Sequence, residues 1–112
     1  MARGDYLGEF ELVVLLGLAR LDDEAYGMTV FEEIERVTGR DLTIPAVYVT
    51  LSRLQKKGYV DSRTGDATAE RGGRAKKFYR ITEAGETALR ASQEMLDRLW
   101  SGIRTGQATS NS

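Results

Sequence analysis

The sequence of 112 residues contains no cysteine and no histidine. Without cysteine there is no disulfide, no thiolate metal site and no thiol nucleophile. Without histidine the chain lacks the usual general base and the commonest metal ligand. These absences argue against an enzyme or a metalloprotein, and we expect no catalytic residue, no metal and no cofactor.

Long apolar runs are also missing. No run approaches the ~18 residues that a helix needs to span a bilayer, and the N-terminus lacks the basic region and apolar core of a signal peptide. We therefore expect no membrane partner and a cytoplasmic location. The length fits one domain that is large enough to bury a hydrophobic core.

The charge is unevenly distributed, although the net charge is only −1. Residues 40–80 contain ten Lys and Arg against four Asp and Glu, a net charge of +6, and the remainder contains six against thirteen, a net charge of −7. A basic middle between acidic flanks is typical of a surface that meets phosphates. A chance cluster of solvated charges would give the same count.

Three helices are predicted in the first half of the chain. The first covers residues 7–21, whose length and acidic residues favour a buried helix over a buried strand. The second covers residues 26–38, which have one apolar face and are followed by a glycine. The third starts at Pro45, with Thr43 or Ile44 in the cap region, because proline suits the first helical turn.

Two short strands and a long helix follow. Residues 59–63 and 77–81 are rich in Tyr, Val, Phe and Ile, and the Gly-rich basic segment between them predicts an antiparallel hairpin. Thr82 is a good N-cap for a last helix that extends to about Ile103. This order predicts a mainly α fold with a small β-hairpin, namely a winged helix-turn-helix with a long C-terminal dimerisation helix. The predicted parts are the DNA-binding domain at 1–81 with its wing at about 59–81, the helix at 82–104 and a disordered tail at 105–112.

The third helix and the hairpin form the predicted DNA-binding surface. With Val47 and Leu51 in the core, the outward face of the helix is small near its start and basic further on, so it can approach base edges and phosphates closely. Glycines between the basic residues of the hairpin let the backbone follow a groove. The alternatives are a solvated helix face and a hairpin tip kept soluble by its charge. The predicted DNA-binding residues are Pro45, Ala46, Tyr48, Val49, Thr50, Arg53, Lys56, Lys57, Arg71, Gly72, Gly73, Arg74, Lys76 and Lys77.

The last helix carries an apolar seam. Leu89, Leu96 and Ile103 are seven residues apart, and Ser92 and Leu99 occupy the positions between them, as in a coiled coil. An exposed apolar stripe usually finds a partner, so we predict a homodimer. The alternative is a helix that folds back on its own core. The predicted dimer-interface residues are Leu12, Leu16, Leu89, Ser92, Leu96, Leu99, Trp100 and Ile103.

Met95 and Trp100 lie beside this seam. At an interface the two side chains could form a platform for a small aromatic effector, and we name them as the candidate effector-binding residues. Simple packing within the interface would use the same side chains. The sequence leaves both interpretations open.

The chain resembles the PadR family of bacterial regulators, of the short type with a single C-terminal helix. The resemblance covers roughly residues 7–103 and rests on LGEFELVVLLGLARL, YGMTVFEEI, VYVTLSRLQKKGYV and GGRAKKFYRITEAGETAL. It implies a dimer that binds palindromic sites in double-stranded DNA, usually represses transcription and, in some members, responds to small aromatic molecules. It also implies a phosphate contact for Tyr48, whose ring could instead be purely structural.

One stretch departs from the family pattern. Many members have Gly-Thr/Ser-Leu-Tyr-Pro at the third helix, whereas here Pro45 precedes Tyr48. The fold should tolerate this order because proline fits a first helical turn. The operator sequence cannot be transferred from the family.

Two other function classes compete with a DNA-binding regulator. A winged helix can serve as a protein–protein interaction module, with the basic surface against an acidic partner. An enzyme would need a carboxylate pair or a Lys/Ser arrangement in a pocket, whereas the acidic residues here fall in the first turns and on the outward faces of helices. The basic third helix and basic hairpin favour DNA.

Overall fold

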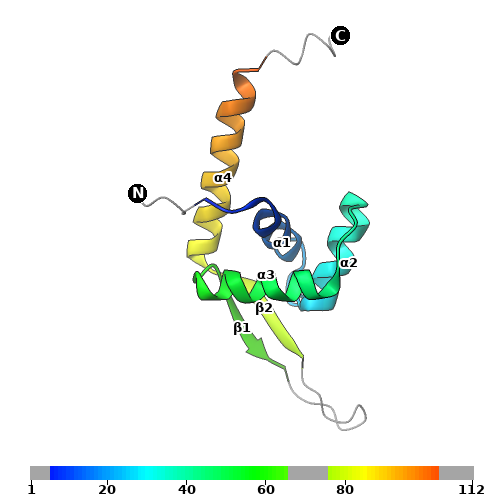
Figure 1. Cartoon of the computed structure of the whole chain (residues 1–112). Coiled ribbons are helices and arrows are strands. Elements are labelled where there is room, and N and C mark those ends of the chain that lie inside the picture. Colours follow the sequence, from blue (N-terminus) through cyan, green and yellow to red (C-terminus); the bar gives the residue numbers. More distant parts are fainter. Residues whose placement is uncertain (1–5, 66–75, 104–112) are drawn as a thin grey trace.

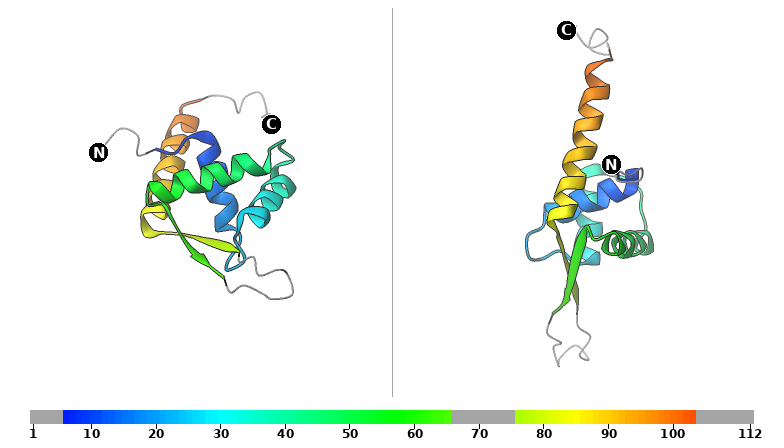
Figure 2. Two further views of the ribbon diagram at one scale, coloured as in Figure 1. Left: turned by 60° about the horizontal axis from the view of Figure 1, so that its bottom comes forward. Right: turned by 90° about the vertical axis from the view of Figure 1, so that its left-hand side faces the viewer.

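The computed structural model describes residues 6–65 and 76–103, which form a mainly helical winged fold (Figure 1). Three helices pack around one core, a hairpin projects from one side, and the last helix extends away on the opposite side (Figure 2). This arrangement confirms the predicted fold class and the order of the elements. The elements are α1 (Glu9–Ala19), α2 (Gly27–Thr38), α3 (Ile44–Lys56), β1 (Val60–Thr64), β2 (Lys77–Ile81) and α4 (Glu83–Ser101).

Helix α1 is shorter at both ends than the predicted span of 7–21. Gly8 is its N-cap, and the Glu11 carboxylate reaches back to accept a hydrogen bond from the Gly8 N–H at 2.8 Å. This local bond caps the N-terminus of the helix, which therefore begins at Glu9. At the other end, Leu21 donates to the Leu18 carbonyl in a tight turn, so the apolar run continues beyond the helix itself.

Side-chain caps and glycines set the ends of the other helices. The Thr43 hydroxyl accepts from the Ala46 N–H at 3.2 Å, so α3 starts one residue before the predicted Pro45. Gly39 ends α2 in the left-handed conformation, with φ of 66°. The Thr82 hydroxyl accepts from the Gly85 N–H at 3.1 Å and starts α4 as predicted.

Helix α4 ends at Ser101, two residues before the predicted end at about Ile103. The N–H groups of Gly102 and Ile103 donate to the carbonyls of Leu99 and Trp100, at 3.2 and 2.9 Å. These are three-residue bonds that tighten the last turn and close the helix.

The hairpin is tied to the helices at its base. Its register pairs Val60 with Ile81, and β1 is displaced by one residue from the predicted 59–63. The displacement arises because Tyr59 hydrogen bonds instead to residues outside the hairpin, with its N–H on the Leu54 carbonyl and its carbonyl accepting from the Thr82 N–H. On the other strand, the Tyr79 N–H donates to the Ala25 carbonyl at 2.8 Å, just before α2. The base of the wing is therefore held in a defined position relative to α2 and α3.

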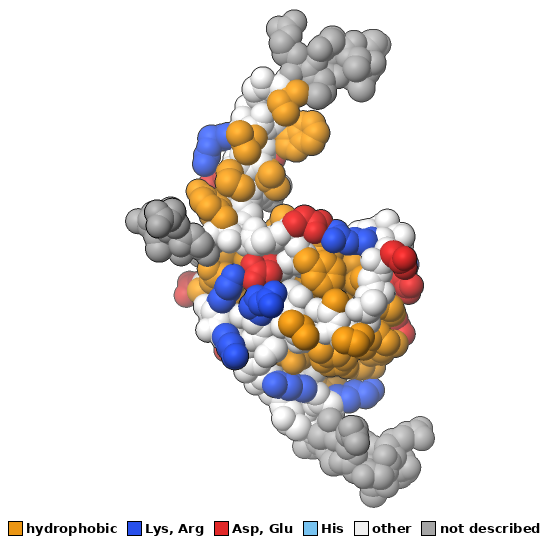
Figure 3. All heavy atoms as spheres, viewed as in Figure 1, with side chains coloured by type: hydrophobic (Ala, Val, Ile, Leu, Met, Phe, Trp, Pro, Cys, Tyr) orange, Lys and Arg blue, Asp and Glu red, His pale blue; other side chains and the backbone are white. Residues whose placement is uncertain are grey.

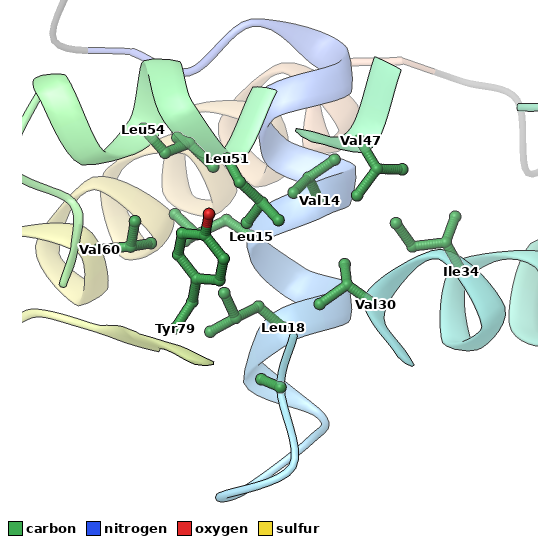
Figure 4. Packing of buried hydrophobic residues seen from close by; sticks show 11 residues of the cluster. Val14, Leu15, Leu18, Val30, Ile34, Val47, Leu51, Leu54, Val60 and Tyr79 are labelled. Carbon is green, nitrogen blue, oxygen red and sulfur yellow. The ribbon is translucent and has the colours of Figure 1, made fainter. Parts of the chain in front are cut away.

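The core lies where α1 passes behind α3 (Figure 4). The predicted stripe of Val47, Leu51 and Leu54 is confirmed, because all three side chains are fully buried. Each such side chain stabilises the fold by roughly 1.5–3 kcal/mol relative to an exposed position. This burial fixes which face of α3 is left for a partner. Around the three side chains lie Val14, Leu15, Leu18, Ala25, Val30, Ile34, Val60 and Tyr79.

Candidate nucleic-acid interface

The exposed face of α3 carries most of the helical residues that the sequence predicts to contact DNA. Val49 and Tyr48 are 55% and 45% exposed, and Pro45, Arg53 and Lys56 are exposed as well. These side chains point to solvent because the opposite face of α3 is buried in the core. Lys and Arg side chains are visible over α3 and along the hairpin (Figure 3). The outward face is thus apolar in its first half and cationic in its second half.

Thr50, another predicted DNA contact, does not lie on this exposed face. Its residue is only 4% exposed. At about 100° per residue, Thr50 lies about 60° from Val47 and about 40° from Leu54 around the helix, on the buried side. Ala46, another predicted contact, is half-buried at the edge of the exposed face.

Lys57 is paired within the chain, although the sequence predicts that it contacts phosphate. Its Nζ donates a hydrogen bond of 2.8 Å to Oε2 of Glu11, which is 8% exposed. The ion pair joins the end of α3 to the first turn of α1. Any phosphate that approaches Lys57 would compete with a carboxylate that is already in place.

Tyr48 packs against the start of α2. A Cβ placed on Gly27 would fall within 2.5 Å of the Tyr48 hydroxyl oxygen, so only glycine leaves room for the ring. Nearly half of Tyr48 remains exposed on its other side. The ring is therefore held by α2 while part of it faces solvent beside the exposed residues of α3.

Cations and aromatic rings alternate at the end of the two strands that leads into the loop of the hairpin. The Lys76 ammonium lies 4.4 Å from the Tyr26 ring centroid and donates to the Tyr26 hydroxyl at 3.2 Å. The Tyr26 and Phe78 rings meet edge to face at 5.4 Å. The Arg63 guanidinium lies 4.7 Å from the Phe78 centroid. These contacts hold positive charges on the wing while keeping them exposed.

Two exposed cations of the hairpin, Arg63 and Arg80, are not among the predicted DNA contacts. Arg63 lies opposite Phe78 in the register, and only that register shows that its charge joins those of Lys76 and Lys77. Lys77 lies 5.7 Å from the Tyr79 ring centroid. The predicted contacts Arg71, Gly72, Gly73 and Arg74 lie outside the described residues.

Two further carboxylates are engaged by arginines on the helical body. The Glu33 carboxylate accepts from Arg36 and from Arg20, both at 2.7 Å, and these hydrogen bonds lower the pKa of Glu33. Glu9 accepts from Arg40, in one bond at 2.8 Å, and its pKa is lowered for the same reason. Together with Glu11, these acidic residues form ion pairs between elements of the body. Among the described ion pairs, none involves Arg53 or Lys56.

The predicted dimer residues mostly lie along a groove between α1 and α4. Leu12, Leu16, Leu89, Leu96 and Trp100 line it, together with Glu86, Arg90 and Asp97. Leu99 and Ile103 are exposed, at 62% and 51%, beyond the lining. Ser92 is different, since it is 2% exposed and its hydroxyl lies 3.4 Å from the Leu7 N–H, which donates to it. Within its own chain Ser92 is therefore already in contact with the N-terminal segment, and its place in a dimer interface stays a prediction.

The two candidate effector residues do not both line the groove between α1 and α4. Trp100 is 60% exposed and lines the α1–α4 groove, whereas Met95 is half-buried and does not line it. Within residues 6–65 and 76–103, no group of three acidic side chains is placed to hold a metal ion, and no helix is long and apolar enough to cross a bilayer.

A family model matches most of the chain, and solved structures of members of that family share its fold. The model of the transcriptional regulator PadR-like family matches residues 15–91. A PadR family transcription regulator from Clostridium difficile R20291 superposes with a TM-score of 0.70 at 18% identity, covering 91% of this chain and 99% of that chain. A PadR family regulator from Eggerthella lenta DSM 2243 gives 0.67 at 23% identity, with coverage of 93% and 88%.

One similar structure contains DNA. The Orc1 protein of Aeropyrum pernix in complex with DNA has a TM-score of 0.61 and 24% identity, over 83% of this chain and 26% of that chain. Comparison with curated protein sequences found no match. Because the family match runs from α1 through α2, α3 and the hairpin into α4, the chain belongs to the PadR-like family of transcriptional regulators.

Proposed function

We propose that this chain binds double-stranded DNA, with α3 in the major groove and the hairpin against the phosphate backbone. The observation that carries the proposal is the solvent-facing side of α3, where Arg53 and Lys56 are exposed and join no described ion pair. Unpaired cations on a protruding helix suit guanine edges and phosphates. The exposed cations of the hairpin, Arg63, Lys76 and Lys77, extend the positive surface beyond the helix.

Electrostatics on the rest of the molecule support this orientation. Glu33 and Glu9 form ion pairs with arginines of the helical body, and Glu11 neutralises one lysine at the end of α3. Of the described cations outside these ion pairs, six lie on α3 and the hairpin, whereas Arg90 and Arg98 lie on α4 among its four acidic residues. A surface of this kind attracts a polyanion by counterion release, so affinity should fall steeply as salt rises.

We further propose that two copies bind one palindromic operator. The apolar groove between α1 and α4 and the exposed Leu99 and Ile103 are unfavourable in water, and α4 of a second copy would cover them. A two-fold axis through this contact would place two α3 helices about one DNA turn apart, ~34 Å, or a multiple of it. Such a dimer represses when its operator overlaps a promoter.

The groove is also the proposed site of regulation by a small aromatic molecule. Trp100 is 60% exposed and lines the groove, where Leu12 and Leu96 provide apolar walls. A flat ligand stacked on Trp100 would change how the two copies meet and hence the distance between their α3 helices. Titration of planar aromatic compounds against fluorescence tests this part, because Trp100 is the single tryptophan. No change in emission across a varied panel would contradict it.

A selection of bound duplexes from random sequence tests the DNA-binding proposal. We expect a two-fold symmetric site, and we expect Arg53→Ala to weaken binding to it by about 1–3 kcal/mol. Arg36→Ala is the matched control, because Arg36 pairs with Glu33 on α2. A protein that bound no duplex at low salt would contradict the proposal and favour a protein–protein interaction module.

A further inference from the structure

The first half of α3 offers few groups that could hydrogen bond to bases. Residues 44–52, IPAVYVTLS, contain no Asn, Gln, Arg, Lys, Asp or Glu. Thr50 is buried, and the Thr43 hydroxyl just before the helix accepts from the Ala46 N–H as the cap. The hydroxyls of Tyr48 and Ser52 are the polar side-chain groups left on this exposed surface.

Apolar side chains occupy the centre of the same surface. At about 100° per residue, Pro45, Val49 and Ser52 lie within about 60° of one another, opposite the buried stripe. Val49 is 55% exposed. Valine at a solvated helix position adds nothing to the core and is a weaker helix former than most alternatives, so its place there is unexplained by stability.

We propose that Val49, with Pro45 beside it, reads the C5 methyl groups of thymine in the major groove. This inference rests on the proposed DNA-binding function and specifies what the first half of α3 recognises. Residues near the start of a recognition helix are the ones that contact base edges. Thymine is the base that presents an apolar group there, and apolar side chains discriminate it by contact with the methyl. Each half-site therefore contains thymine opposite the first two turns of α3. Arg53, four residues after Val49, contacts the base or the phosphate next to that thymine.

Deoxyuridine substitution tests this proposal on the unaltered protein. Each thymine of the selected operator is replaced singly by deoxyuridine, which keeps the base pair and removes only the methyl. We expect affinity to fall about fourfold at one or more positions of a half-site, the loss that accompanies removal of one methyl from an apolar contact. The proposal is overturned if every substituted duplex binds like the parent, or if the selected half-site contains no thymine.

The variant Val49→Ala tests whether Val49 is the residue that contacts the thymine methyl. In Val49→Ala the penalty for deoxyuridine at the sensitive position should largely disappear, while the penalty at other positions is unchanged. Val37→Ala is the matched control, because Val37 is a similarly exposed valine on α2, at 47%, and should leave every penalty as it was. A penalty that persists in Val49→Ala overturns the assignment. Failure to select any duplex would instead contradict the proposed function itself.

Discussion

Lys57 at the end of α3 and Glu11 in the first turn of α1 form a hydrogen-bonded ion pair of 2.8 Å. Burial acts to raise the pKa of Glu11, but the hydrogen bonds from Lys57 and the Gly8 N–H, together with the charges of Lys57 and Arg53, outweigh it, so the pKa is lowered. The carboxylate is therefore charged at neutral pH. It neutralises a cation at one end of the helix that we propose to enter DNA.

Glu11→Gln should increase affinity for duplexes of any sequence. The amide oxygen can still accept from the Gly8 N–H, but it no longer neutralises Lys57, which becomes free to contact a phosphate. One added phosphate contact steepens the dependence of log affinity on log salt by about 0.9. Fluorescence anisotropy of labelled duplexes over a salt series measures this slope.

The control for this variant is Glu33→Gln. It removes the same charge from an ion pair with Arg20 and Arg36 on the helical body. An equal increase in slope for Glu33→Gln would mean that net charge, and not Lys57, causes the effect. An unchanged slope in Glu11→Gln would mean that Lys57 gains no phosphate contact when Glu11 is neutralised.

Acid should destabilise the protein through Glu11. Because its pKa is lower in the folded than in the unfolded chain, the ionised carboxylate contributes stability that is complete above its ordinary pKa of 4.5. That contribution is lost as the pH falls through the folded pKa. Melting temperatures followed by circular dichroism between pH 7 and 3 should fall less in Glu11→Gln than in the parent protein. Parallel curves would show that Glu11 makes no net contribution to acid sensitivity.

Tyr48 should contribute to DNA binding through its hydroxyl, while Gly27 leaves the space that the Tyr48 ring occupies. Gly27→Ala places a methyl where the Tyr48 ring lies, so the ring must move away from α2. Tyr48→Phe keeps the packing and removes only the hydroxyl. If that hydroxyl donates to a phosphate, Tyr48→Phe should weaken binding about tenfold, as for a hydrogen bond to a charged group. Equal affinity of Tyr48→Phe and the parent protein would assign the ring a structural role alone.

Leu96→Asp should convert the proposed dimer to a monomer. The aspartate would place a charge in the apolar groove that α4 of a second copy is proposed to cover. Thr87→Asp is the matched control, because nine residues at about 100° each place it on the opposite side of α4. Sedimentation should show a monomer for Leu96→Asp and a dimer for Thr87→Asp. If the Leu96→Asp variant remained dimeric, the apolar seam of α4 would not be part of the dimer interface.

Local features of the chain were predictable because their causes lie within a few residues. The spacing of Val47, Leu51 and Leu54 alone predicts which face of α3 is buried, and the structure buries all three. Thr82 predicts the start of α4 through a bond to Gly85, three residues on. The resemblance to the family then extended these local signals to a complete winged fold.

Other outcomes depended on which elements pack together. Thr50 looks like a surface residue until the width of the buried face of α3 is known, and Ser92 looks like part of a seam until the N-terminal segment covers it. Lys56 and Lys57 are adjacent lysines that the sequence does not distinguish. The fold brings Glu11, 46 positions away in the chain, to Lys57. Spacing along the chain determines which side of a helix is apolar, whereas only the packing of distant segments decides which polar and charged groups remain free to meet a partner.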